Sequence, residues 1–192
     1  MKVKFLSVLV CLSTLLVCFS GCNSKKTSTI HADWPYYKTS EEIIEASTDI
    51  YSGTLKSISF EIIDYKTGTV DRSHDSLSTS RMLYTIYTIE VIDKYKGRSV
   101  SEMKISLEGG LVGYKEKEQY DLLKNAGLLR NNSTIPTLGK DTHVLNIGEK
   151  YLFCTVKMAG EYELVINPDQ FVFEMNSDMA KNIINLLGGN ND

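Results

Sequence analysis

Histidine is scarce in this chain of 192 residues, and its three copies are not spaced as metal ligands. His31, His74 and His143 stand far apart, and the sequence contains neither the H-E-x-x-H nor the C-x-x-C pattern of common zinc sites. The G-x-S-x-G elbow that carries the nucleophile of α/β-hydrolases is also missing. The sequence therefore predicts no metal site, no cofactor and no catalytic residue.

Long apolar runs are scarce as well, and the clearest one lies at the N-terminus. Residues 5–19 are apolar apart from three hydroxyl residues, and this run is shorter than the about 20 residues that a membrane-spanning helix needs. Lys2 and Lys4 precede the run, and the small residues Ser20 and Gly21 follow it. A basic start, an apolar stretch and a small-residue exit indicate a secretory signal peptide over residues 1–21.

Cys22 stands directly after this exit, and Phe19-Ser20-Gly21-Cys22 resembles the lipobox of bacterial lipoproteins, with Phe19 where Leu is usual. In that family the Cys thiol receives a diacylglycerol thioether, a peptidase cleaves just before it, and the Cys becomes an N-terminus acylated by chains such as palmitate. The resemblance implies that Cys22 is lipidated and holds the protein at the extracytoplasmic face of a cell membrane. An ordinary signal peptide with an incidental Cys, or an uncleaved N-terminal anchor, is the alternative.

The chain also lacks an excess of positive charge. Residues 1–21 hold two lysines and no acidic residue, so the net charge of −3 becomes −5 once they are removed. Nucleic-acid-binding proteins normally display a clustered basic surface, so we expect no nucleic-acid partner. The partners that we expect are the membrane, through the lipid anchor, and a protein or another envelope ligand.

Only two cysteines lie outside the leader. If Cys22 carries lipid, Cys154 has no partner for an internal disulfide, and the domain must be stabilised by its hydrophobic core. The 171 residues that follow the 21-residue leader are enough for one such domain. We expect a polar tether over residues 22–33 and a single domain over residues 34–192. Cys154 lies in a strand-like run, where a buried and unreactive thiol is typical.

The pattern of apolar residues predicts a mainly β domain. Five runs are β-rich and are expected to form strands: residues 49–64, 82–95, 100–107, 150–158 and 161–167. Helical spacing and capping residues predict three helices, at residues 40–47, 115–126 and 178–187. The first helix is expected to begin with a capping box formed by Thr39 and Glu42, and Gly53 is expected to mark a bulge in the first strand or a bend at a barrel corner.

Three strands, a helix and two strands, flanked by a helix at each end, form the element order of an OB-type barrel. We therefore predict a five-stranded OB-like barrel with a helix between strands three and four. Three segments resemble the netrin-type OB module, best known from the tissue inhibitors of metalloproteinases: DIYSGTL (49–55), YTIEVIDKYKG (87–97) and GEKYLF (148–153). The resemblance covers about residues 48–166 and implies the fold alone. Those inhibitors chelate zinc through a free N-terminal Cys, whereas Cys22 is expected to carry lipid.

An OB barrel usually binds its ligand on the face of strands two and three, and with the loops between strands one and two and between four and five. In this chain the first of these loops, residues 64–80, is long, whereas the second is a tight turn at residues 159–160. The residues expected to contact a ligand lie in this long loop and on strand two: Arg72, His74, Tyr84 and Tyr87. The two tyrosines are taken to face outward, and packing in the core is the alternative for them.

Two functions remain open from the sequence. The first is a non-enzymatic binding or interaction module on a membrane-anchored lipoprotein. The second is an extracytoplasmic hydrolase that would use loop 64–80, with Arg72, His74 and Asp75, together with the glycine-rich segment 109–113. That segment lacks the Lys-Ser/Thr pair of a phosphate-binding loop. The hydrolase requires the loop and the segment to converge in one pocket, whereas the binding module does not.

Overall fold

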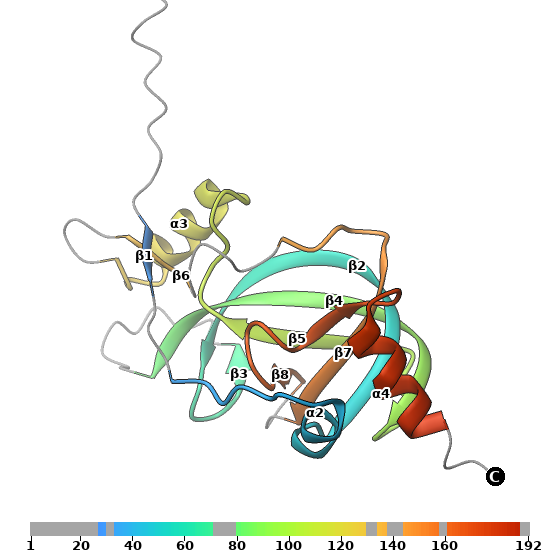
Figure 1. Ribbon diagram of the computed structural model, residues 1–192. Coiled ribbons are helices and arrows are strands. Elements are labelled where there is room, and N and C mark those ends of the chain that lie inside the picture. The colour runs from blue at the N-terminus through green and yellow to red at the C-terminus, as the bar shows by residue number, and fades with distance from the viewer. Residues whose placement is uncertain are drawn as a thin grey trace, which may run out of the picture.

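The computed structural model of the protein describes residues 27–29, 33–70, 80–129, 134–137, 144–157 and 161–188 (Figure 1). Within these residues the fold is mainly β, as predicted, with one sheet of seven strands and three helices. The strands of this sheet are β2 (Asp49–Asp64), β3 (Thr69–Val70), β4 (Arg81–Lys96), β5 (Glu102–Glu108), β7 (Lys150–Lys157), β8 (Glu163–Val165) and β9 (Val172–Glu174). The helices are α2 (Ser40–Ala46), α3 (Glu116–Asn125) and α4 (Asp178–Gly188).

Five of the seven strands form a closed ring. The sheet runs in the order β3-β2-β4-β5-β8-β7-β9, and β2 also pairs with β7, which joins the ends of the run β2-β4-β5-β8-β7. The neighbouring pairs in the ring are antiparallel except for β5 and β8, which are parallel. The five strands of the ring are the five strands that the sequence predicts, in the predicted order along the chain.

Strand β2 pairs with two other strands of the ring, one along each edge. Its N-terminal residues pair with β7, while nearly the whole strand pairs with β4. The register against β4 shifts at three places, one of them between Ser52 and Gly53. A Cβ atom at Gly53 would lie 2.5 Å from Ile89 Cγ2 and 2.7 Å from the Glu90 carbonyl oxygen, so the close approach of β4 requires glycine. A register shift is therefore found at Gly53, and the residue without a partner at this shift is Ile92 of β4.

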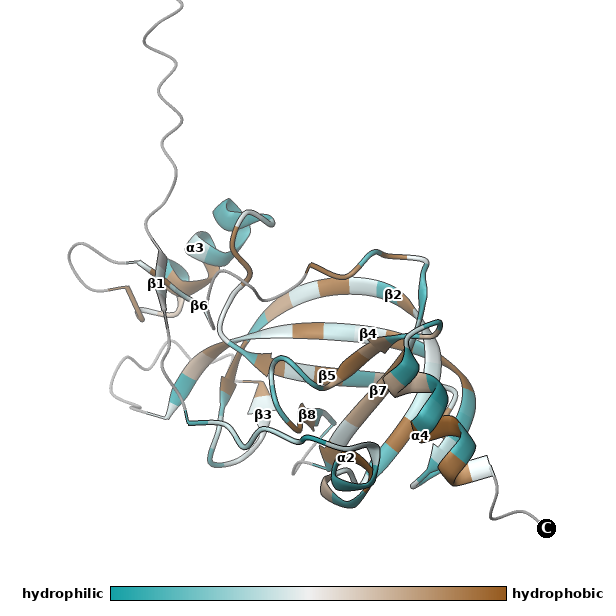
Figure 2. Ribbon diagram, viewed as in Figure 1, coloured by the Kyte–Doolittle hydropathy of each residue, from teal (hydrophilic) through white to brown (hydrophobic). Residues whose placement is uncertain are grey.

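The interior of the ring forms the main hydrophobic core. Figure 2 shows hydrophobic and hydrophilic residues alternating along β2 and β4, as expected for strands that turn one face inward. The buried residues of β5 include Met103, Ile105 and Leu107, each at most 4 % exposed. A smaller buried cluster lies apart from this core and consists of Ile63, Tyr84, Ile86 and Tyr162. Strand β4 contributes to both clusters and is therefore covered on both faces.

Helices α2 and α4 lie near the beginning and the end of the domain sequence. They pack against each other at one end of the ring, while α3 lies at the other end (Figure 1). The predicted capping box of α2 is confirmed, because Thr39 Oγ1 accepts from the Glu42 N–H at 3.2 Å and Glu42 Oε2 accepts from the Thr39 N–H at 3.3 Å. At the start of α4, Ser177 Oγ accepts from the Ala180 N–H at 3.3 Å. No helix in the described part of the chain has the length and apolar character needed to span a bilayer.

A short additional sheet forms outside the ring. Strand β1 (Thr27–Thr29), inside the predicted tether, pairs in parallel with β6 (Ile135–Thr137), which lies between α3 and β7 along the chain. Strands of three residues are too short to show the alternation that predicts longer strands. The start of loop 64–80 likewise forms a hairpin, in which β3 pairs with the end of β2. Short pairings of this kind satisfy backbone groups that would otherwise be left to water.

Candidate functional site

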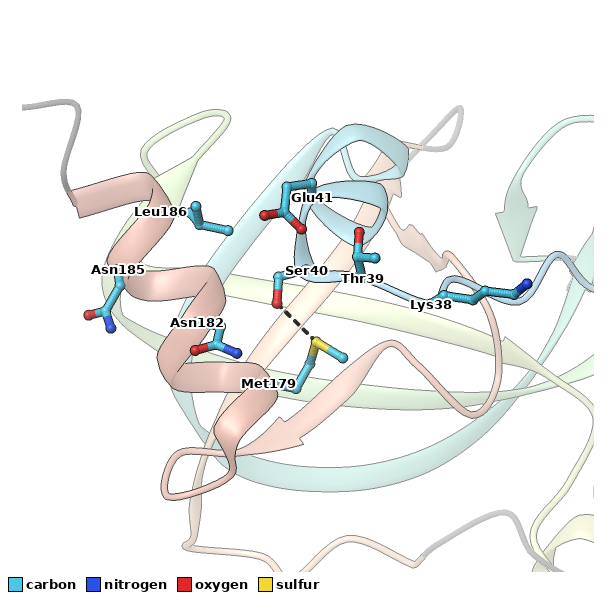
Figure 3. Close-up of a pocket in the computed structure, with 8 residues that line it drawn as sticks. All are labelled: Lys38, Thr39, Ser40, Glu41, Met179, Asn182, Asn185 and Leu186. Atoms are coloured by element: carbon cyan, nitrogen blue, oxygen red, sulfur yellow. Dashed lines mark hydrogen bonds between the residues drawn. The ribbon is translucent and has the colours of Figure 1, made fainter.

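A surface cleft of about 470 Å³ lies between the start of α2 and the outward side of α4 (Figure 3). Eight residues line it: Lys38, Thr39, Ser40, Glu41, Met179, Asn182, Asn185 and Leu186. The first four precede or begin α2, and the last four belong to α4. The sequence did not predict this cleft, because Ser40 and Met179 on its two walls are separated by 139 positions along the chain.

The spacing of residues along α4 explains one wall of the cleft. Asn185 and Leu186 follow Asn182 by three and four positions, so both are neighbours of Asn182 on the helix surface, and all three residues are exposed. The opposite, apolar side of α4 packs on the core. The buried Ser40 hydroxyl donates to Met179 Sδ at 3.2 Å, which joins α2 to α4 (Figure 3).

The cleft presents hydrogen-bonding groups of several kinds. The carboxamides of Asn182 and Asn185 can each donate and accept, while Lys38 and Glu41 add one charge of each sign. Leu186 is 42 % exposed and offers an apolar contact. None of the eight lining residues is a buried acid or base, so the cleft is suited to holding a polar ligand rather than to transferring protons.

A second cleft, of about 620 Å³, lies between Phe60 of β2 and helix α3. Its charged side chains pair with each other along the helix. Lys117 Nζ is 2.5 Å from Asp121 Oδ2, and Lys115 Nζ is 3.5 Å from Glu118 Oε2. The lining residues of this cleft therefore carry no surplus charge that would attract an ionic ligand.

A polar cluster is buried where β2, β4, β7 and β8 approach one another. It consists of Asp49, Tyr51, Arg98, Thr155 and Glu163. The side chain of Arg98 is 46 % exposed, whereas the other four residues are at most 4 % exposed. Glu163 Oε1 accepts from Arg98 Nη2 at 2.8 Å, and Glu163 Oε2 accepts from the Thr155 hydroxyl. The buried carboxylate of Glu163 is thus both ion-paired and hydrogen-bonded, as buried charges must be.

Asp49 is the second buried carboxylate of the polar cluster. It accepts hydrogen bonds from three donors: the Tyr51 hydroxyl at 2.7 Å, the Thr48 hydroxyl at 2.8 Å and the Arg98 backbone N–H at 3.1 Å. Burial alone would raise the pKa of Asp49, but these hydrogen bonds hold the pKa below its ordinary value. Gly97 has φ +87°, and a Cβ atom there would lie 2.1 Å from Asp49 Oδ1. The network satisfies its own groups and joins neighbouring strands, so we assign it a structural role.

The structure describes two of the four predicted ligand-contacting residues, Tyr84 and Tyr87. Three residues of the long loop lie outside the described residues: Arg72, His74 and Asp75. Tyr84 and Tyr87 are 1 % and 0 % exposed, so the outward orientation predicted for them is wrong. Tyr87 packs inside the ring against Phe171, with 5.6 Å between ring centroids, and Tyr84 belongs to the smaller buried cluster. Neither tyrosine reaches the surface, because β4 is covered on both faces.

The glycine-rich segment 109–113 makes its contacts within the protein. Four of its backbone N–H groups donate at 2.7–3.2 Å to oxygens of Leu83, Pro136, Gln119 and Glu116. The side chain of Gln119 is fully buried and also donates to the Leu111 carbonyl at 2.9 Å. These N–H groups are therefore not free to hold a phosphate or an oxyanion, and the segment gives no support to the hydrolase hypothesis.

Cys154 is buried, as predicted. It is 0 % exposed, and burial raises the pKa of its thiol to about 12. The reactive form of cysteine is the thiolate, so the thiol stays protonated and unreactive at neutral pH.

The hydroxyl of Tyr87 has no hydrogen-bond partner among the described residues, although the side chain is fully buried. A buried polar group without a partner costs about 1–3 kcal/mol. We therefore expect Tyr87→Phe to raise the free energy of unfolding by about 1 kcal/mol, measured by urea denaturation. Tyr51→Phe is the matched control and should lower the free energy of unfolding, because the Tyr51 hydroxyl donates to Asp49. A loss of stability in both variants would contradict this prediction.

No protein-family model matches this chain, and no curated protein sequence matches it. The site is therefore defined by the geometry of the chain itself. Of the surfaces described above, the cleft between α2 and α4 offers carboxamides that are not already paired with neighbouring side chains, so it is the better candidate for ligand binding.

Proposed function

We propose that this protein is a lipoprotein, anchored through Cys22 at the extracytoplasmic face of the cell membrane, and that its β domain binds a partner without catalysing a reaction. The observation that carries this proposal is the position of Cys22, directly after Ser20 and Gly21 at the end of a basic and apolar leader. Acyl chains on Cys22 would keep the domain at the membrane surface, since each buried CH₂ group contributes about 0.8 kcal/mol to membrane binding.

The ring of five strands is, in this proposal, an OB-like barrel. Support comes from the position of α3 between the third and fourth ring strands along the chain. Closure of the ring through the β2–β7 and β5–β8 pairings points the same way, as does the resemblance of residues 48–166 to the netrin-type module. A barrel of this kind is a rigid scaffold, and the ligand is decided by the side chains on its surface.

The partner is a polypeptide segment of an envelope protein, held in the cleft between α2 and α4. An Asn carboxamide presents the same donor and acceptor as a peptide group, so Asn182 and Asn185 can pair with an extended backbone. Leu186 can contact an apolar side chain of the partner, and Lys38 and Glu41 can select charged neighbours.

A photo-cross-linking amino acid at Leu186, in the full lipidated protein in intact cells, tests this function. We expect a defined cross-linked partner from position 186 and none from Glu102, an exposed position on β5 that serves as the control. The cross-link should be lost when Asn182→Ala and Asn185→Ala are combined. Equal products from both positions, or a product that survives the alanine pair, would count against the cleft, and substrate turnover by the purified protein would count against a non-enzymatic role.

A further inference from the structure

Strand β1 fixes the end of the predicted tether to the folded domain. Thr27 is paired with Ile135 and Thr29 with Thr137, and the Thr137 hydroxyl donates to the Ser28 carbonyl at 3.5 Å. Ile135 and Thr137 are 1 % and 2 % exposed, so β6 is itself part of the packed structure. Thr137 also forms a β-bridge with Gly110, in the turn that leads to α3. The chain that leaves Cys22 is therefore attached to the domain at the end formed by β1, β6 and α3.

The attachment at β1 makes the tether short. Thr27 follows Cys22 by five positions, and five residues span at most about 18 Å when fully extended. Without β1 the first residue held by a hydrogen bond to the domain would be Pro35, whose carbonyl accepts from the Asn167 side chain; it lies thirteen positions after Cys22, which allows about 47 Å. A domain of this size has a radius of gyration of about 15 Å and is therefore about 40 Å across. The tether is shorter than the domain is wide, so the attached end stays near the anchor.

The cleft between α2 and α4 lies at the other end of the domain. Figure 1 shows β1, β6 and α3 together at one end of the ring, with α2 and α4 at the opposite end. We propose that the end formed by β1, β6 and α3 faces the phospholipid surface, and that the α2–α4 cleft points away from the membrane. This inference rests on the proposed lipid anchor at Cys22.

The charge on α3 indicates what kind of contact this end makes with lipid. Residues 115–125, which are Lys115 and helix α3, hold three lysines and three acidic residues, so this segment carries no net charge. Lys117 and Lys115 are paired with Asp121 and Glu118, which leaves Lys124 as the exposed lysine of the segment without an ion pair to another described residue. One basic residue contributes about 1 kcal/mol at an anionic membrane surface. On a zwitterionic bilayer this attraction is absent, and the tether alone sets the orientation.

Site-specific fluorescence quenching on the full lipidated protein tests the orientation. Lys117→Cys on α3 and Lys181→Cys on α4 are matched variants, since both lysines are exposed and lie on helices at opposite ends of the domain. Each is labelled with a thiol-reactive fluorophore, because Cys154 is fully buried and Cys22 is expected to be acylated. The proteins are reconstituted into phosphatidylcholine vesicles that carry a nitroxide on the headgroup. We expect several-fold stronger quenching at position 117 than at position 181.

A longer tether provides the second arm of the test. Ten Gly/Ser residues inserted between Asn23 and Ser24 should remove most of the difference between the two labels, because the attached end is then free to leave the surface. Equal quenching at both positions, or stronger quenching at position 181, in a protein that sediments with the vesicles would overturn the orientation and leave the anchor intact. A protein that carries no acyl chain and does not sediment with the vesicles would overturn the anchor and the orientation together.

Discussion

A Cys22→Ala variant is expected to lose its fatty-acid label completely and to leave the membrane fraction. In the proposed lipoprotein the thioether to diacylglycerol would form on the thiol of this residue, and alanine offers no atom to which the lipid could be attached. Two or three acyl chains hold a protein at a bilayer far better than one chain does, so their joint loss should release the domain. Metabolic labelling with a fatty-acid analogue, followed by membrane fractionation, measures both effects.

Cys154→Ala is the control for this experiment. The Cys154 side chain is 0 % exposed in the domain core, so its removal should leave labelling and membrane association unchanged. Cys22→Ser adds a second check, because serine keeps a nucleophilic atom of similar size but cannot form a thioether. Undiminished labelling of the Cys22→Ala protein would remove the basis for the anchor.

Asp49→Ala is expected to lower the free energy of unfolding by about 3–5 kcal/mol. The substitution leaves the buried Tyr51 hydroxyl and the Arg98 backbone N–H without their acceptor, and each unsatisfied donor carries a desolvation cost. Urea denaturation of the wild type and the variant at neutral pH measures the difference. Glu90→Ala is the matched control, because the Glu90 side chain is 60 % exposed and paired with Lys56 at 2.9 Å, and its removal should cost less than about 1 kcal/mol. Similar losses in the two variants would show that burial of the Asp49 network contributes little.

The cost of Asp49→Ala should also depend on pH. The folded-state pKa of Asp49 is lowered, so its carboxylate stabilises the fold fully above the unfolded-state pKa of about 3.9, and this contribution is lost as pH falls through the lower folded-state pKa. The stability difference between wild type and variant should therefore be constant near neutral pH and shrink below about pH 4. A difference that stays constant down to pH 3 would show that the charge of Asp49 is not what stabilises the domain.

The parts of this fold that the sequence predicted are those decided by neighbouring residues. The capping box of Thr39 and Glu42 and the irregularity at Gly53 depend on local sequence, and both are found in the structure. The five strands of the ring and the three helices follow from the same kind of pattern.

The parts that the sequence did not predict depend on contacts between distant segments. Tyr84 and Tyr87 were expected to face outward, but the ring encloses one face of β4 and a second cluster covers the other. The α2–α4 cleft forms where two helices meet that lie near the beginning and the end of the domain sequence. The β1–β6 pair joins two segments without a β-type pattern. The polar cluster draws Asp49, Arg98 and Glu163 from separate elements, so no local motif could mark it.

Closure of the ring also sets the order in which the chain can fold. Strand β2 is synthesised early, but its partner β7 follows much later, and the contact between Asp49 and Thr155 spans 106 positions. Contacts of such long range make folding slow, because the loop between them must be closed before they gain any stability. Until β7 arrives, the N-terminal half of β2 has an open edge that another chain could pair with. A chain truncated before Lys150 should therefore aggregate rather than fold.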